Sequence, residues 1–170
     1  ENVNFYEISD IDDKIFNVDS FETSTGLIVY VAKEINSSEG LYFKANYDML
    51  TKLPNRNLLN DRFNLLLSQS KRTNTKLAVL FADLDGFKKI NDNYGHPYGD
   101  YVIKTTAQIL KNSVRNIDVV ARYGGEEFTV ILVDTNQSSS LVVAERIVLN
   151  VENYNFSLNG INEHMSISAG

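Results

Sequence analysis

The sequence predicts an α+β domain, in which helices pack on a mainly antiparallel sheet, preceded by a short β-rich segment. Three observations lead to this fold class. From residue 48 onwards, apolar residues at helical spacing alternate with short apolar runs of the kind found in strands. Two neighbouring runs, 119–123 and 128–133, are joined across a glycine pair, which is a hairpin signal. In residues 1–40, by contrast, apolar and polar residues alternate with a period of two, as they do in strands.

Residues 1–47 are interpreted as the tail of an upstream sensor domain followed by a helical linker. Alternating patterns predict strands at 5–8 and 14–18, and an apolar stretch predicts a third strand at 27–32. The linker helix is expected over 41–50. A segment of this length buries too little core to be expected as an independent domain.

Residues 48–170 form the main predicted domain, and its elements follow from their apolar patterns. Apolar residues recur at helical spacing after Pro54, a residue suited to the first turn of a helix. The continuous apolar run at 77–82 predicts a central buried strand. Further helices are expected over 87–94, 98–114 and 141–151, and further strands over 119–123, 128–133, 156–158 and 165–169.

The composition excludes several kinds of function. The chain has 170 residues, of which 43% are hydrophobic, so it can bury a substantial core. Its net charge of −6 argues against binding through a phosphate backbone, and we expect no nucleic-acid partner. Single nucleotides remain compatible with this charge, because metal ions can supply positive charge locally. The absence of cysteine excludes disulfides, thiolate metal sites and cysteine nucleophiles.

No feature of the sequence places this chain in a membrane. No apolar run approaches the roughly 20 residues of a spanning helix, and no signal peptide is visible. A chain without cysteine suits a reducing compartment, so we expect a cytoplasmic domain. The sequence begins at Glu1 and is expected to be a piece of a longer chain, so attachment of the parent protein to a membrane stays open.

Acidic residues stand at the ends of two predicted strands. Asp83 and Asp85 follow the apolar run, and Glu126 and Glu127 follow the glycine pair. If the two strands are neighbours, these carboxylates gather and repel one another unless a cation lies between them. Oxygen ligands of this kind favour Mg²⁺ or Mn²⁺, which bind carboxylates together with substrate phosphates. The alternative is that both pairs are ordinary acids in solvated turns, and both interpretations stay open at this point.

Five segments, in order and with matching spacing, resemble the GGDEF domain of diguanylate cyclases in its GGEEF variant. They are DMLTKLPNR (48–56), DLDGFKKIND (83–92), YGHPYGD (94–100), RYGGEEF (122–128) and SAG (168–170). The resemblance implies a palm-like, ferredoxin-like βααββαβ core. It also implies that two GTP molecules become cyclic di-GMP with release of two pyrophosphates. Each 3′-hydroxyl attacks the α-phosphate of the other GTP, so a homodimer is implied, controlled by an upstream sensor domain in the same chain.

The resemblance assigns roles to the predicted acids. Asp83 and Glu126 match the catalytic metal carboxylates, and the Leu84 carbonyl matches a backbone ligand. Glu127 matches an acid that assists a second metal, and Glu126 also matches the base for the 3′-hydroxyl. Two Mg²⁺ or Mn²⁺ ions are implied for each active pair of half-sites. Metals in such pairs activate a hydroxyl and stabilise the phosphoryl group under attack.

A second group of matched residues is implied to hold the nucleotide. Asn91 and Asp100 match the guanine readers, and a carboxylate suits the N–H donors on the Watson–Crick edge of guanine. Phe87 and Lys88 match the segment whose backbone cradles phosphate. Considered without the resemblance, Asn91 and Asp100 also suit helix caps, and that alternative stays open.

A third group matches a site at which the family binds its product as a feedback inhibitor. Arg115 and Asp118 match its RxxD pattern, and Arg146 matches a further arginine of that site. Arginine binds phosphate at two points, and a carboxylate accepts hydrogen bonds from guanine. Bound cyclic di-GMP is then expected to fix the domains in an unproductive arrangement. The alternative is an ordinary surface Arg–Asp pair at a helix end.

The sequence departs from the family pattern at three points. Lys52 replaces a glycine at a position that we interpret as structural, and Glu126 is an accepted replacement for aspartate. The sequence ends at Gly170, ahead of the family's next helix and its basic contacts to the triphosphate, so this piece is expected to bind GTP weakly or not to turn over. Two alternatives to an active cyclase remain: a catalytically silent module that binds GTP or cyclic di-GMP, and a mainly structural role in dimerisation.

Overall fold

A computed structural model describes the following residues of the chain: 10–11, 14–22, 28–35 and 37–170. The strand predicted at 5–8 lies outside them. The chain divides into two compact units, Glu1–Ala45 and Asn46–Gly170, and each is described by itself. Among the helices of the described residues, none combines the length and the apolar character needed to span a membrane.

The first unit contains an antiparallel sheet of three strands followed by a helix. In chain order these are β1 (Asp10–Ile11), β2 (Lys14–Glu22), β3 (Ile28–Ile35) and α1 (Ser37–Asn46). The strands predicted at 14–18 and 27–32 fall on β2 and β3, and both strands continue further along the chain than the sequence pattern indicated.

The linker helix, predicted over 41–50, begins earlier, at Ser37, and it ends at Asn46 because the chain turns back on itself there. Asp48 N–H donates to the Leu53 carbonyl at 2.8 Å, and Lys52 N–H donates to the Asp48 carbonyl at 2.8 Å. The Asp48 side chain also accepts from Thr51 N–H at 2.8 Å. Lys52 lies at φ 59°, in the left-handed region that favours glycine. Lysine at this position therefore strains the backbone of a turn.

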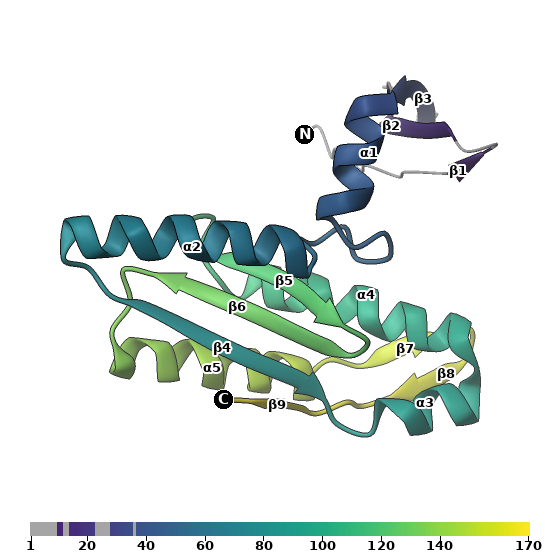
Figure 1. Ribbon diagram of the computed structural model, residues 1–170. Coiled ribbons are helices and arrows are strands. Elements are labelled where there is room, and N and C mark those ends of the chain that lie inside the picture. The colour runs from purple at the N-terminus through teal and green to yellow at the C-terminus, as the bar shows by residue number, and fades with distance from the viewer. Residues whose placement is uncertain (1–9, 12–13, 23–27, 36) are drawn as a thin grey trace. The chain divides into compact units, whose positions relative to one another are not determined.

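The second unit contains a four-stranded sheet in the order β5-β6-β4-β9, in which every neighbouring pair is antiparallel (Figure 1). Its strands are β4 (Leu77–Leu84), β5 (Val119–Gly124), β6 (Glu127–Val133) and β9 (Ile167–Ala169). Its helices are α2 (Arg56–Thr73), α3 (Phe87–Tyr94), α4 (His96–Asn112) and α5 (Gln137–Glu152). A separate hairpin consists of β7 (Phe156–Leu158) and β8 (Ile161–Glu163).

The main sheet and its helices follow the predicted βααββαβ order, which runs β4, α3, α4, β5, β6, α5 and β9. The β7–β8 hairpin is inserted before the last strand. The strand predicted at 156–158 is therefore present, but it pairs outside the main sheet. β8 was not predicted, because Ile161 is its one apolar residue and a single apolar residue gives no alternating pattern.

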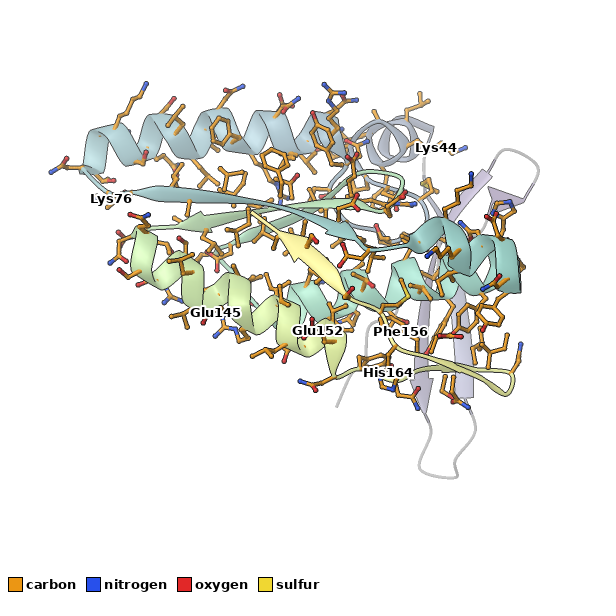
Figure 2. The ribbon with its side chains drawn as sticks, turned by 90° about the horizontal axis from the view of Figure 1, so that it is seen from below. Lys44, Lys76, Glu145, Glu152, Phe156 and His164 are labelled. Atoms are coloured by element: carbon orange, nitrogen blue, oxygen red, sulfur yellow. The ribbon has the colours of Figure 1, made fainter. Side chains whose placement is uncertain are left out.

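Helices cover both faces of the main sheet, with α2 on one face and α4 and α5 on the other (Figures 1 and 2). The larger core lies on the side of α4 and α5 and includes Leu84, Val102 and Phe128. The smaller core lies under α2, where Leu59 packs with Ile131 of β6. The sheet is therefore held from both sides, and its strand ends are fixed in register.

Candidate active site

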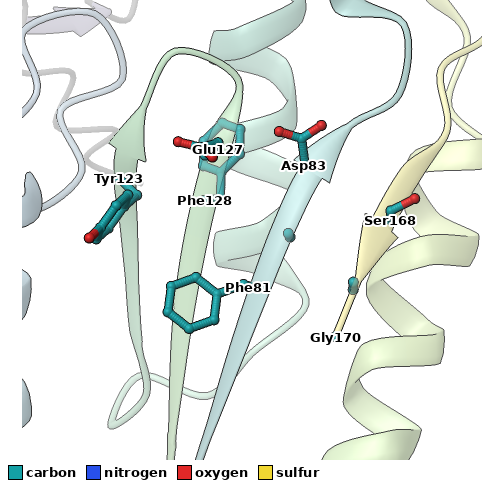
Figure 3. A pocket seen from close by; sticks show the side chains of 9 residues that line it. Phe81, Asp83, Tyr123, Glu127, Phe128, Ser168 and Gly170 are labelled. Atoms are coloured by element: carbon teal, nitrogen blue, oxygen red, sulfur yellow. The ribbon is translucent and has the colours of Figure 1, made fainter.

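The acids predicted at two strand ends are brought together by the pairing of β4 with β6. Asp83 of β4 lies directly opposite Glu127 of β6 in the antiparallel register. Leu84 N–H donates to the Glu126 carbonyl at 3.4 Å. Burial alternates along β4, so Leu84 points into the core and Asp83 is exposed on the opposite face. Figure 3 shows the Asp83 and Glu127 side chains on neighbouring strands at the same end of the sheet.

The environment of Asp83 favours a bound cation. Burial raises the pKa of its carboxyl, and the charges of Glu126, Glu127 and Asp85 raise it further. Like charges directly opposite each other on neighbouring strands destabilise a sheet. The carboxylates and the Leu84 carbonyl are hard oxygen ligands, which suit Mg²⁺ or Mn²⁺. In the described part of the chain no three acids already surround one point, so an ion here would also need oxygens from water or substrate.

Asp85, the second acid of the Asp-Leu-Asp segment, has its carboxylate occupied by hydrogen bonds within the protein. Its Oδ1 accepts from the Ser168 hydroxyl and its Oδ2 from the Ser166 hydroxyl, both at 2.7 Å. The hydrogen bonds from Ser166 and Ser168 lower the pKa of Asp85. Asp85 therefore fastens β9 to the end of β4. This function was not predicted from the sequence, in which the only signal is two serines at alternate positions of the predicted strand 165–169.

An open cavity of about 570 Å³ lies beside the acids. Residues of β4, β5, β6 and β9 line it, among them Phe81, Asp83 and Tyr123. Phe81 is 58% exposed, and its ring meets the ring of Tyr123 edge-on with 6.1 Å between the centroids. The cavity thus has an aromatic wall next to an acidic end (Figure 3).

The glycine turn between β5 and β6 is held in place by Arg122. Its Nε and Nη2 donate to the Gly125 carbonyl at 2.9 and 2.8 Å. Its Nη1 donates to both carboxylate oxygens of Asp48 at 3.0 Å. Gly125 itself lies at φ 46°, a backbone conformation that residues with a side chain rarely adopt. The turn that carries Glu126 is therefore fixed by a glycine conformation and by an arginine.

The predicted nucleotide-binding residues lie on α3 and α4. Phe87 and Lys88 open α3, and among the described residues nothing accepts a hydrogen bond from their N–H groups, as is usual in a first turn. Asn91 lies within α3 and its side chain touches Gly99 of α4, next to Asp100. Both helices have glycine at the N-cap and no side-chain cap, so the helix-cap alternative for Asn91 and Asp100 is wrong.

The family model described as "Diguanylate cyclase, GGDEF domain" matches residues 45–170. The chain belongs to the GGDEF family. Diguanylate cyclase DosC of Escherichia coli K12 is 40% identical over 124 residues, which cover 72% of this chain and 27% of DosC. Diguanylate cyclase A of Treponema denticola is 39% identical over 140 residues, which cover 80% of this chain and 37% of that protein.

Solved GGDEF structures have the same fold. A form of YfiN from Pseudomonas aeruginosa comprising only the GGDEF domain matches with a TM-score of 0.70 and 36% identity, covering 73% of both chains. The coiled coil and GGDEF domain of DgcB from Caulobacter crescentus, in complex with c-di-GMP, match with a TM-score of 0.72 and 28% identity, covering 78% of this chain and 71% of that one. The predicted palm-like α+β core is therefore confirmed. The curated relatives are much longer than this chain, which spans 27% and 37% of the two named above.

The predicted product-binding residues of the GGDEF domain line a separate cavity of about 470 Å³. Arg115, Asp118 and Arg146 all face it. The Asp118 carboxylate accepts from the N–H groups of Arg115 and Val133, both at 2.9 Å. Arg146 Nε donates to the Ser113 carbonyl at 3.0 Å. In the part of the chain that the structure describes, Arg115 and Asp118 form no ion pair, so the surface-pair alternative does not account for them.

Proposed function

We propose that this GGDEF domain belongs to a diguanylate cyclase, which condenses two GTP molecules into cyclic di-GMP and releases two pyrophosphates. The observation that carries the proposal is the position of Asp83 opposite Glu127, beside the backbone of Glu126, at one end of the sheet. The family match and the names of the curated relatives support it. Burial and the charges of Glu126 and Glu127 raise the pKa of Asp83, and a silent binding module would not require acids that repel one another in this way.

In the proposed reaction each step forms a bond between a 3′-oxygen and the α-phosphorus of the other GTP, and the bond to pyrophosphate breaks. Glu126 accepts the proton of the attacking 3′-hydroxyl. Mg²⁺ or Mn²⁺, two ions for each pair of half-sites, would be held by Asp83, the Leu84 carbonyl, Glu126 and Glu127, and supplies positive charge to the phosphates when bound. Arg122 keeps the turn with Glu126 in a fixed position relative to Asp83.

The nucleotide is proposed to lie between α3 and the acids. The Asp100 carboxylate accepts hydrogen bonds from the N–H groups of guanine, and the Asn91 carboxamide supplies both donors and an acceptor. The N–H groups of Phe87 and Lys88, in the first turn of α3, bind phosphate oxygens, which the helix N-terminus also favours electrostatically. These assignments are supported by the shared position of Asn91 and Asp100 at the contact between α3 and α4.

The proposed active form is a homodimer, because each domain holds one GTP and the reaction joins two. We assign residues 1–47 to the tail of an upstream sensor domain with its linker, and 48–170 to the catalytic domain. The division of the chain after Ala45 and the family match from residue 45 support this boundary. GTP is a cytoplasmic nucleotide, so the domain is proposed to face the cytoplasm.

The test is to incubate the full-length protein with GTP and Mg²⁺ and to measure cyclic di-GMP by mass spectrometry. We expect product from the wild type, and a fall of about 10²–10⁴ in kcat for Glu126→Gln, which removes the base. Glu145→Gln changes a glutamate exposed on α5 (Figure 2) and should keep full activity. A full-length dimer that binds GTP without making product would show that the protein is a silent binding module.

We also propose that cyclic di-GMP binds the cavity around Arg115 as a feedback inhibitor. The Arg115 guanidinium has no hydrogen-bond partner among the described residues, so it is available to phosphate. The presence of c-di-GMP in the DgcB structure supports a product-binding function in the family. Calorimetry should show Arg115→Ala binding cyclic di-GMP at least about tenfold more weakly. Lys104→Ala, which changes an exposed cation on α4, should bind normally. If Arg115→Ala bound cyclic di-GMP as tightly as the wild type, the proposed site would be excluded.

A further inference from the structure

Gly99, in the first turn of α4, packs directly against the side chain of Asn91 on α3. A Cβ atom at position 99 would overlap Asn91 Oδ1, and it would lie 3.0 Å from Asn91 Cγ and 3.2 Å from Phe87 Cζ. The backbones of α3 and α4 are also linked, because Gly95 donates to the Asn91 carbonyl at 2.9 Å and accepts from Gly99 N–H at 3.2 Å. The missing side chain at 99 therefore leaves the space that the Asn91 carboxamide fills.

The backbone conformation of Gly99 does not itself require glycine. Its φ lies outside the left-handed region, unlike that of Gly95. Within a helix, glycine is less favourable than alanine by about 1 kcal/mol. Helix stability alone would therefore favour alanine here. Glycine at position 99 is instead explained by the close approach of the Asn91 side chain, which leaves no space for a Cβ atom.

The group that a larger side chain would displace is the end of a side chain and not the backbone. The fold can accept a methyl group at 99 if the Asn91 carboxamide turns away and the Phe87 ring gives slightly. A larger side chain at position 99 should therefore change the orientation of the Asn91 carboxamide. No other described residue forms a hydrogen bond with that carboxamide, so its donors and its acceptor are available to a ligand.

We propose that Gly99 determines nucleotide specificity. Because position 99 has no side chain, the Asn91 carboxamide can occupy the space beside it, where Asn91 and Asp100, the residue after Gly99, present their polar groups to one guanine base. This inference rests on the proposed function, in which GTP is the ligand. Gly99 and Asp100 are consecutive in α4, so one helical turn fixes both guanine readers. A site that pairs its polar groups with guanine rejects other bases, because those groups are then left unpaired.

The test is a double-mutant cycle on GTP binding to the full-length protein. We expect Gly99→Ala and Asn91→Ala each to raise the Kd for GTP about tenfold, the effect of roughly one hydrogen bond, and to reduce the preference for GTP over ATP by a similar factor. The double variant should bind GTP as Asn91→Ala does, because Gly99 acts only through Asn91. A wild-type Kd for Gly99→Ala, or losses that add in the double variant, would overturn the proposal.

A second measurement does not depend on any nucleotide. The NMR signals of the Asn91 side-chain amide should move in Gly99→Ala, and signals that stay in place would show that the seating itself is wrong. The matched control is Gly160→Ala, in the β7–β8 turn, where φ is 83° and no atom lies close. It should lower Tm through backbone strain and keep the preference for GTP. If the wild type binds no GTP but the Asn91 signals move in Gly99→Ala, the proposed ligand is wrong, while the contact between Gly99 and Asn91 is confirmed.

Discussion

One nitrogen of Arg122, Nη1, donates to both carboxylate oxygens of Asp48 at 3.0 Å, while its other two nitrogens hold the Gly125 carbonyl. Both partners are largely buried, with 16% of the Arg122 side chain and 23% of the Asp48 side chain exposed. The ion pair joins segments 74 positions apart in the chain. It therefore connects the loop before α2 with the turn that carries Glu126.

Asp48→Asn should destabilise the domain by about 1–3 kcal/mol, because the partly buried Arg122 guanidinium loses its charged partner. Cyclase activity should also fall, since the glycine turn is held less firmly. Urea unfolding at pH 7 measures the first effect. Asp61→Asn, on the exposed side of α2, is the matched control and should stay within about 0.5 kcal/mol of the wild type. Equal stability of the two variants would show that the ion pair contributes nothing.

The same pair should make stability depend on acid pH. Burial alone would raise the pKa of Asp48, but hydrogen bonds from Thr51 and Arg122 together with the Arg122 charge outweigh it, so the pKa lies below its ordinary value. An acid of this kind contributes stability that is present above its ordinary pKa, about 4, and is lost as the pH falls through the lowered value. The stability advantage of the wild type over Asp48→Asn should therefore shrink below about pH 4. A constant difference down to strongly acid pH would contradict this.

Asp83→Asn should have opposite effects with and without a divalent cation. The pKa of Asp83 is raised, so the folded state holds its proton more tightly, and stability falls as the pH rises from the ordinary value through the raised one. In EDTA at pH 7 the variant should melt about 1–3 °C above the wild type, because repulsion with Glu127 is relieved. With Mg²⁺ the wild type should gain stability and the variant should not. Equal stabilisation of both by Mg²⁺ would exclude Asp83 as a ligand.

Lys52→Gly should stabilise the domain by about 0.5–1 kcal/mol and leave kcat unchanged, because lysine at φ 59° is strained and glycine is not. Urea unfolding is the measurement. Asn74 lies at φ 55° as the C-cap of α2, and Asn74→Gly should gain less, since asparagine tolerates this conformation better than lysine. A loss of stability in Lys52→Gly would show that contacts of the lysine side chain outweigh the strain.

Two buried hydroxyl groups should respond to removal in opposite directions. Tyr98 donates its hydroxyl to the carbonyl of the buried Phe156, so Tyr98→Phe removes that hydrogen bond and should cost about 0.5–1.5 kcal/mol. Thr106 Oγ1 is buried and has no hydrogen-bond partner within the described residues, so Thr106→Val should be neutral or stabilising. Thermal unfolding compares the two variants. Hydrogen exchange should also locate the loss in Tyr98→Phe to the β7–β8 hairpin, and stabilisation by that change would reject the assignment.

The elements around the site could be predicted from the sequence because their apolar patterns are long and regular. The run at 77–82 and the helix at 87–94 both fall on elements of the structure, β4 and α3. The hairpin between β5 and β6 followed from its glycine pair. The pairing of Asp83 with Glu127 could only be assumed, since the register between distant strands is set by packing on the faces of the sheet.

The contacts that hold the site together could not be predicted from local patterns. Asp85 bonds to Ser168, 83 positions away, and nothing in either segment by itself indicates the other. The approach of Asn91 to Gly99 depends on the angle between α3 and α4. The β7–β8 hairpin could not be predicted as a pair, because β8 has a single apolar residue and shows no alternation.

The pairing of β4 with β9 has a consequence for biosynthesis. β4 carries Asp83, and β9 is added to its free side by Asp85 and the two serines. A nascent chain that has passed the glycine turn already contains every acid of the proposed site, but its β4 still lacks one neighbour. Contacts of such long sequence separation form late, because a long loop has to close first. During synthesis, β4 therefore gains its second neighbour only after residues 166–169 have left the exit tunnel.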